Sequence, residues 1–182
     1  MEITSKIFWR EALKSGTIIG IVTGCISMLQ SFMESPAWSS VLGWLYYILL
    51  ALLIYAFTRK IARMSRPSDG FPYGRCIGYV FAMMIFAGVV MGLITSLTYN
   101  VIAPGMLTGT LDTTFGMLEG MYSYDDMDRM YDMMYSMMRN PLVLILSGII
   151  TMCFWGGLFG LVTSAIAQRK PQPFAEDGNI QE

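Results

Sequence analysis

The stretch that decides the fold lies at residues 76–99 and reads CIGYVFAMMIFAGVVMGLITSLTY. It contains no Asp, Glu, Lys or Arg. A helix rises ~1.5 Å per residue and the hydrocarbon core of a bilayer is ~30 Å thick, so about 20 apolar residues are enough to cross it. The stretch therefore predicts a transmembrane helix.

Three more stretches, at residues 15–33, 38–57 and 142–168, are free of charge and long enough to cross the bilayer. Lys6, Arg10 and Lys14 precede the first, as in a signal peptide, but its length exceeds that of a usual signal sequence and no small-residue cleavage site follows it. We interpret it as an uncleaved signal anchor. The sequence thus predicts an all-α, polytopic membrane protein with four transmembrane helices.

The composition excludes several classes of function. Hydrophobic residues make up 54% of the chain and charged residues 14%, where soluble proteins have about 25% charged. A formal net charge of −1 gives no reason to expect a nucleic-acid partner. The sequence has no histidine, which excludes His-based acid–base catalysis and His-ligated metal sites. Cys25, Cys76 and Cys153 are far apart in or beside apolar stretches, and we expect small buried hydrophobes rather than disulfides or metal ligands.

The basic residues predict the orientation. Ten of the twelve fall on one side of the four spans: Lys6, Arg10, Lys14, Arg59, Lys60, Arg63, Arg66, Arg75, Arg169 and Lys170. An excess of Lys and Arg marks the cytoplasmic side, so both termini are expected in the cytoplasm of a bacterial inner membrane. The turn with Glu34 and the acidic segment 100–140 are then periplasmic. Residues 1–170 are predicted to form one domain, and residues 171–182 a polar, disordered cytoplasmic tail.

A periplasmic helical insert is predicted between the third and fourth spans, at residues 104–140. Apolar residues in 106–121 have helical spacing. Ser123 and Asp126 have the spacing of a capping box, and Asn140 with Pro141 supplies a stop, which predicts an amphipathic helix over 123–140. Its narrow polar arc consists of Asp125, Asp128, Arg129, Asp132, Ser136 and Arg139. The wide apolar face consists of Met127, Met130, Tyr131, Met133, Met134, Tyr135, Met137 and Met138.

We expect this helix to lie roughly parallel to the membrane, because an apolar face of this width needs a cover. It can cover the mouth of the bundle or rest on the bilayer interface. It can instead receive a partner protein, since methionine side chains adapt to different surfaces. Soft thioethers can also bind Cu(I), and this helix carries several of them close together. They belong to Met130, Met133, Met134, Met137 and Met138. The three alternatives remain open at this point.

Small residues recur every fourth position on three of the spans. The sets are Gly16, Gly20 and Gly24; Gly88, Gly92 and Ser96; and Gly156, Gly160 and Ser164, with Gly148 two turns earlier. Such stripes let helix backbones approach closely in lipid, and we expect them to pack the bundle internally. Contacts between protein copies and a ligand passage are the alternatives. The leucine-rich second span lacks a stripe and is expected to face lipid.

The four stretches contain no ionisable side chain, although coupled transporters normally place such groups at depth. Gln30 and Asn100 lie near the periplasmic face, where we expect their amides to satisfy helix ends. Transport is therefore a secondary interpretation.

The chain resembles a family of small four-span bacterial membrane proteins of the Bacteroidetes type, catalogued as a domain of unknown function. The resemblance reaches to about Lys170, and these segments carry it: 8–16 (FWREALKSG), 70–74 (GFPYG), Tyr99-Asn100 with Pro104, the insert ending near Pro141, and 156–160 with Arg169-Lys170. It brings no activity and no catalytic residues. Genes of this family often lie near polyprenyl-phosphate glycosyltransferases, which implies an accessory role beside such an enzyme.

We therefore predict a non-enzymatic accessory or assembly subunit of a membrane complex, with no catalytic, cofactor-binding or metal-binding residues. Its first expected partner is the lipid bilayer. The second is another membrane protein or a second copy of the chain, bound through the glycine faces or the methionine-rich helix. The alternative functions are a small-solute transporter or channel component, and a periplasmic Cu(I)-binding membrane protein.

The topology can be tested with single cysteines placed in a cysteine-free background at Ser68 and at Thr113. A membrane-impermeant thiol reagent added to intact cells with a permeabilised outer membrane should label only the Thr113 variant, because the two positions are predicted on opposite sides. Labelling of both variants from outside would contradict the orientation.

Overall fold

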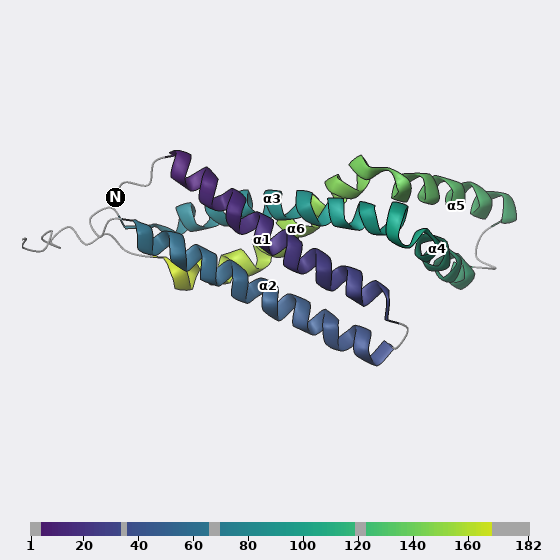
Figure 1. Cartoon of the computed structure of the whole chain (residues 1–182), viewed down its shortest axis with the longest axis horizontal. Coiled ribbons are helices and arrows are strands. Elements are labelled where there is room, and N and C mark those ends of the chain that lie inside the picture. The colour runs from purple at the N-terminus through teal and green to yellow at the C-terminus, as the bar shows by residue number, and fades with distance from the viewer. Residues whose placement is uncertain (1–4, 34–35, 66–69, 119–122, 169–182) are drawn as a thin grey trace, which may run out of the picture.

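The computed structural model describes residues 5–33, 36–65, 70–118 and 123–168 (Figure 1). The described elements are α1 Ser5–Ser31, α2 Pro36–Met64, α3 Tyr73–Leu97, the π-helical turn η1 Thr98–Ile102, α4 Pro104–Leu118, α5 Tyr124–Arg139 and α6 Pro141–Ala167. Helices α1, α2 and α6, and α3 together with η1, are long and apolar enough to cross a membrane. The chain is therefore a multi-pass membrane protein, and the predicted all-α fold with four long apolar helices is confirmed.

Proline is the first residue of three of these helices. Pro36, Pro104 and Pro141 are the first residues of α2, α4 and α6, where the missing N–H is not needed and the fixed φ angle suits a helix. The side-chain oxygen of Asn140 accepts a hydrogen bond from the N–H of Leu142 at 3.0 Å, which caps α6. The predicted capping box at Ser123 is wrong, because that side chain makes no capping bond and only its carbonyl accepts from the first turn of α5.

The helices are longer than the uncharged stretches. Helix α1 begins at Ser5 rather than near residue 15, and α2 continues to Met64 rather than residue 57. The predicted spans stop at the first charged residue. The helices themselves continue, because long Lys and Arg side chains can reach the membrane surface from inside a helix. We call this end of the molecule, with Lys6, Arg10, Lys14, Arg59, Lys60 and Arg63, the basic end. The predicted tail 171–182 and the residues Glu34, Arg66, Arg169 and Lys170 lie outside the described residues.

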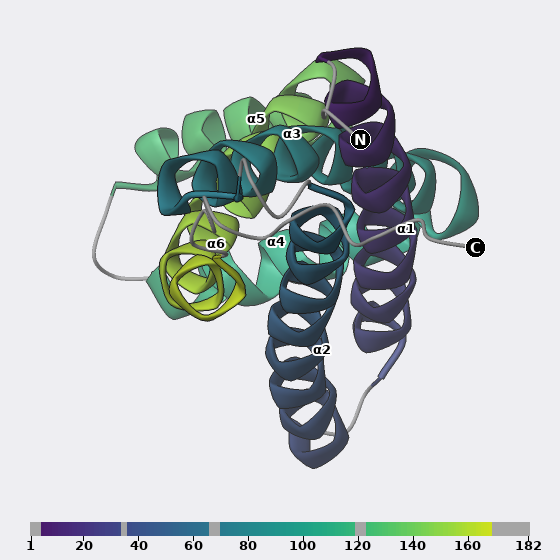
Figure 2. The same cartoon turned by 90° about the vertical axis from the view of Figure 1, so that its left-hand side faces the viewer.

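Helix α3 lies between α1 and α6 and makes its main contacts with both (Figures 1 and 2). Its buried side chains include Tyr79, Val80, Met83, Met84 and Ala87. Helix α2 contacts α6 and α1 and touches α3 less. The bundle is thus a layer of α1, α3 and α6, with α2 laid along one side.

Glycines lie where α1 meets α3. A Cβ atom added to Gly20 would lie 2.7 Å from the carbonyl oxygen of Ala87, and one added to Gly16 would meet the carbonyl oxygen of Met83 even more closely. No side chain fits at such distances from a backbone. At these two positions α1 therefore rests directly on the backbone of α3.

The contact between α3 and α6 is built in the same way. A Cβ atom on Gly92 would lie 2.7 Å from the carbonyl oxygen of Leu144, and one on Gly148 would lie 3.1 Å from the nitrogen of Gly92. Further along, Gly156 and Gly160 face the side chains of Met84 and Val80.

The outer surface of the bundle is apolar. Trp44 and Leu52 on α2 are 73% and 58% exposed, as expected for a helix that faces lipid. Helix α6 is equally open, with Phe154 and Ile166 among its exposed side chains. These surfaces suit contact with the lipid bilayer.

The insert lies at the end opposite the basic end. Helix α4 crosses this end and is seen nearly end-on in Figure 1, whereas α5 runs back along the long axis of the bundle and leads into α6. The short junction at Asn140 and Pro141 ties the end of α5 directly to the start of α6. The orientation of α5 parallel to the membrane stays a prediction.

The backbone contacts can be tested by adding bulk at one glycine at a time. Gly20→Leu and Gly92→Leu should each lower the free energy of unfolding by about 3 kcal/mol or prevent folding, because the helices must separate to admit the side chain. Thermal unfolding in detergent gives the measurement.

Gly78→Leu is the matched control, since it lies on α3 and a Cβ there would have nothing within 4 Å. Leu52→Ala, on the exposed face of α2, should also have a small effect. Equal tolerance of Leu at positions 20, 78 and 92 would contradict the close contacts.

Candidate functional site

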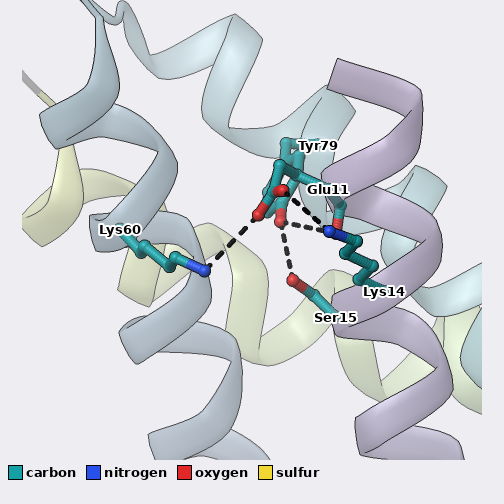
Figure 3. Close-up of polar contacts among 5 residues, drawn as sticks. All are labelled: Glu11, Lys14, Ser15, Lys60 and Tyr79. Atoms are coloured by element: carbon teal, nitrogen blue, oxygen red, sulfur yellow. Dashed lines mark hydrogen bonds and ion pairs between the residues drawn. The ribbon is translucent and has the colours of Figure 1, made fainter. Parts of the chain in front are cut away.

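The structure brings a carboxylate and two amines together at the basic end. Glu11 lies two turns inside α1, and its side chain is 12% exposed. One carboxylate oxygen lies 3.4 Å from Nζ of Lys60 on α2, and the other lies 3.9 Å from Nζ of Lys14 (Figure 3). Both lysines remain more than half exposed, so solvent screens these ion pairs.

A buried hydrogen bond lies beside this cluster. The Tyr79 hydroxyl from α3 is 3.0 Å from Oγ of Ser15 and donates to the backbone carbonyl of Glu11 at 3.3 Å (Figure 3). Tyr79 is 1% exposed and Ser15 is 2% exposed. The edge of the Phe8 ring packs against the Tyr79 ring, with centroids 5.6 Å apart.

Glu11, Lys14, Ser15, Lys60 and Tyr79 form what we call the basic-end cluster. It joins α1 to α2 through Glu11 and α1 to α3 through Tyr79. Ser15 is enclosed and hydrogen-bonded, so a substrate in solvent has no path to it. The arrangement fastens three helices together.

Sequence reasoning missed this cluster. Glu11 stands among basic residues just before the first uncharged stretch, and that position suggested an exposed arm. The available signal was the spacing of Glu11 and Lys14, which places them on one helix face. The pairing with Lys60 depends on tertiary structure and has no local signal.

The amides near the other end of the spans both donate to backbone carbonyls. The expectation that they satisfy helix ends is met by Asn100 and not by Gln30, which instead joins two helices. Gln30 donates to the carbonyl of Ser39 at 3.0 Å and so links α1 to α2. Asn100 donates to the carbonyl of Ser96 at 3.0 Å, within the last turns of α3 and η1. A cavity of about 730 Å³ opens beyond them, bordered by Phe32, Tyr99 and residues of α4. No charged side chain lines it.

The cysteines differ in their surroundings. Cys76 is buried, as predicted, whereas Cys153 is half-buried and Cys25 is exposed on α1. All three are free thiols. The expectation of burial is wrong for Cys25 because it lies on the lipid-facing side of its helix, where an apolar side chain is equally well placed. Over the described ranges, no three Asp, Glu and Cys side chains gather as a metal-binding group.

Only one edge of the apolar face of α5 packs against other described residues. Met127, Tyr131, Tyr135 and Met138 pack against a small core formed by Leu107, Leu111 and Phe115 on α4. The Tyr131 hydroxyl donates to a carboxylate oxygen of Asp112 at 3.0 Å, and this hydrogen bond raises the pKa of Tyr131. Helix α4 is thus the cover for this edge.

Other methionines of α5 remain open to the surroundings. Met133 is 63% exposed and Met137 is 49% exposed, and no residue of α5 is fully buried. The expectation that the whole methionine face turns toward the bundle or bilayer is therefore only partly met within the described chain. Cu(I) binding by this face stays a prediction.

The comparison with protein families identifies the chain. A family model described as a protein of unknown function, DUF4199, matches residues 14–169. The chain belongs to this family. The DUF4199 region contains most of α1, the other three long helices and the α4–α5 insert. The match confirms the resemblance to a family of unknown function. The searches of curated proteins and of solved structures found no match.

The role of the basic-end cluster in this DUF4199 protein can be measured with a double-mutant cycle. Lys60→Met should cost about 1 kcal/mol of stability, because it leaves the mostly enclosed Glu11 with one distant amine. Adding Glu11→Gln should restore part of the loss, with a coupling of about 0.5 kcal/mol or more in detergent unfolding experiments. Strictly additive effects would show that the pair does not join α1 to α2.

Proposed function

We propose that the chain is a non-enzymatic accessory or assembly subunit of a membrane complex. The supporting observation is the part of the α5 face that carries Met133 and Met137, which we call the methionine surface. It lies on the insert, outside the long membrane-spanning helices, and the described chain does not cover it. An adaptable apolar surface outside the bilayer is typical of a site that receives another protein.

The construction of the bundle favours this function over transport. Helix α3 touches the backbones of α1 and α6 over residues 83–92, which leaves no room for a solute path at those two contacts. The basic-end cluster joins three helices, and its buried hydroxyls, those of Ser15 and Tyr79, are hydrogen-bonded to each other. The family resemblance suggests one form of this proposal, in which the chain is an accessory subunit beside a polyprenyl-phosphate glycosyltransferase.

The proposed location is a bacterial inner membrane, with the basic end in the cytoplasm. The positions of Lys6, Arg10, Lys14, Arg59, Lys60 and Arg63 at one end support this orientation. The methionine surface is then periplasmic. A partner that binds it must have a periplasmic segment with apolar side chains.

The proposal can be tested by photo-crosslinking in native membranes. A benzoylphenylalanine residue at Met133 should give a discrete adduct with a different polypeptide, whereas the same residue at Asp125, on the polar arc, should give little. Met133→Asp combined with Met137→Asp should reduce adducts formed from a benzoylphenylalanine at Met130 by about tenfold or more. Its melting temperature in detergent should stay within a few degrees of that of the unchanged protein.

Two results would contradict the proposal. Adducts from position 133 that contain only lipid would show that the methionine surface rests on the bilayer. A large loss of stability on introducing the two aspartates would show that the bundle itself covers this surface.

A further inference from the structure

A groove opens between α2 and α6 within their membrane-spanning parts. It encloses about 600 Å³ and is lined mainly by aromatic rings, those of Trp44, Tyr47, Trp155 and Phe159. The rings of Tyr47 and Trp155 have centroids 4.7 Å apart, and Trp155 stacks on Phe159 at 6.0 Å. Because both helices cross the bilayer, hydrocarbon rather than water surrounds this groove.

A smaller cavity of about 260 Å³ continues the groove toward the interior. Gly43, Tyr47 and Trp155 border both spaces. The smaller cavity also reaches α1 and α3, through Gln30 and Met91. A molecule that occupies both spaces would therefore touch all four long helices.

Three hydroxyl groups line these spaces without a hydrogen-bond partner among the described residues. They belong to Ser27, Tyr47 and Thr151. Other threonines in the spans behave differently, since Thr95 and Thr163 donate to the carbonyl four residues earlier in their own helices. A hydroxyl without a partner costs about 1–3 kcal/mol in surroundings without water. The cavity thus offers polar groups that a bound molecule can satisfy.

The charges restrict what that molecule can be. No Asp, Glu, Lys or Arg lines either space. A phosphate or ammonium group would enter without a counter-charge, at a high cost in free energy. The polar part of the ligand must therefore be neutral, and the part that lies against the aromatic rings must be hydrocarbon.

We propose that this groove and the cavity beside it bind a membrane lipid of the diacylglycerol type, with an acyl chain lying against the aromatic rings and uncharged ester or hydroxyl oxygens beside Ser27, Tyr47 and Thr151. A transmembrane helix of another protein does not fit the inner cavity, because a helix with its side chains is about 10–12 Å wide. A single acyl chain and a glycerol backbone need less room.

The test uses the full chain in phosphatidylcholine nanodiscs, with Trp155 as the sole tryptophan after Trp9, Trp38 and Trp44 are changed to Phe. Diacylglycerol with brominated acyl chains is added at increasing mole fraction, and quenching of Trp155 fluorescence is recorded. Brominated phosphatidylcholine is the reference probe. Diacylglycerol should reach half-maximal quenching at a mole fraction several-fold lower than the reference. Both lipids carry the same esters, but diacylglycerol has a neutral hydroxyl where phosphatidylcholine has a charged phosphocholine group, which the cavity cannot pair.

Ser27→Ala combined with Thr151→Val should remove this preference while leaving the weaker quenching by both lipids. Thr163→Val is the matched control on the same helix, because its hydroxyl is already bonded to the carbonyl of Phe159. It should keep the preference.

Two outcomes would overturn the proposal. Equal quenching by both brominated lipids, unchanged in the double variant, would mean bulk bilayer contact only. No quenching by either lipid would mean that a protein segment, such as a helix of a second copy, occupies the groove.

Discussion

The direct contact of the α3 backbone with α1 and α6 is the constraint on which the remaining structure depends. In lipid no hydrophobic force drives helices together, so close packing must supply the attraction. Gly16 and Gly20 allow it on one side of α3, and Gly92 with Gly148 allows it on the other. Because neither contact has space for a side chain, the three helices have little freedom to slide or separate.

Helix α2 is placed differently, and the consequences appear on its surface. It packs along α6 and α1 through side chains of varied size, without a row of glycines. Lys60 and Glu11 attach it at the basic end, and Gln30 attaches it near the other end through Ser39. Between these two attachments the large rings of Tyr47 and Trp155 hold α2 and α6 apart, which creates the lateral groove.

Sequence reasoning predicted well the features that depend on residues close together in the sequence. Uncharged length predicted the four long helices, and Pro104, Asn140 and Pro141 marked helix boundaries. The enclosed position of Glu11, the direction of α5 and the cavity beside Thr151 depend on which helices meet in space. A pattern along one helix carries no such information. The exposure of Met133 escaped prediction for the same reason, since α4 covers only one edge of α5.

The arrangement of α3 between α1 and α6 also imposes an order of assembly. During synthesis α1 is already in the membrane when α3 arrives, so the contact at Gly20 can form at once. The opposite side of α3, with Gly88 and Gly92, has no partner until the whole of α4 and α5 has been made and α6 follows. Throughout that interval the insertion machinery or lipid must shield a bare strip of helix backbone. The length of the α4–α5 insert therefore sets how long this intermediate persists.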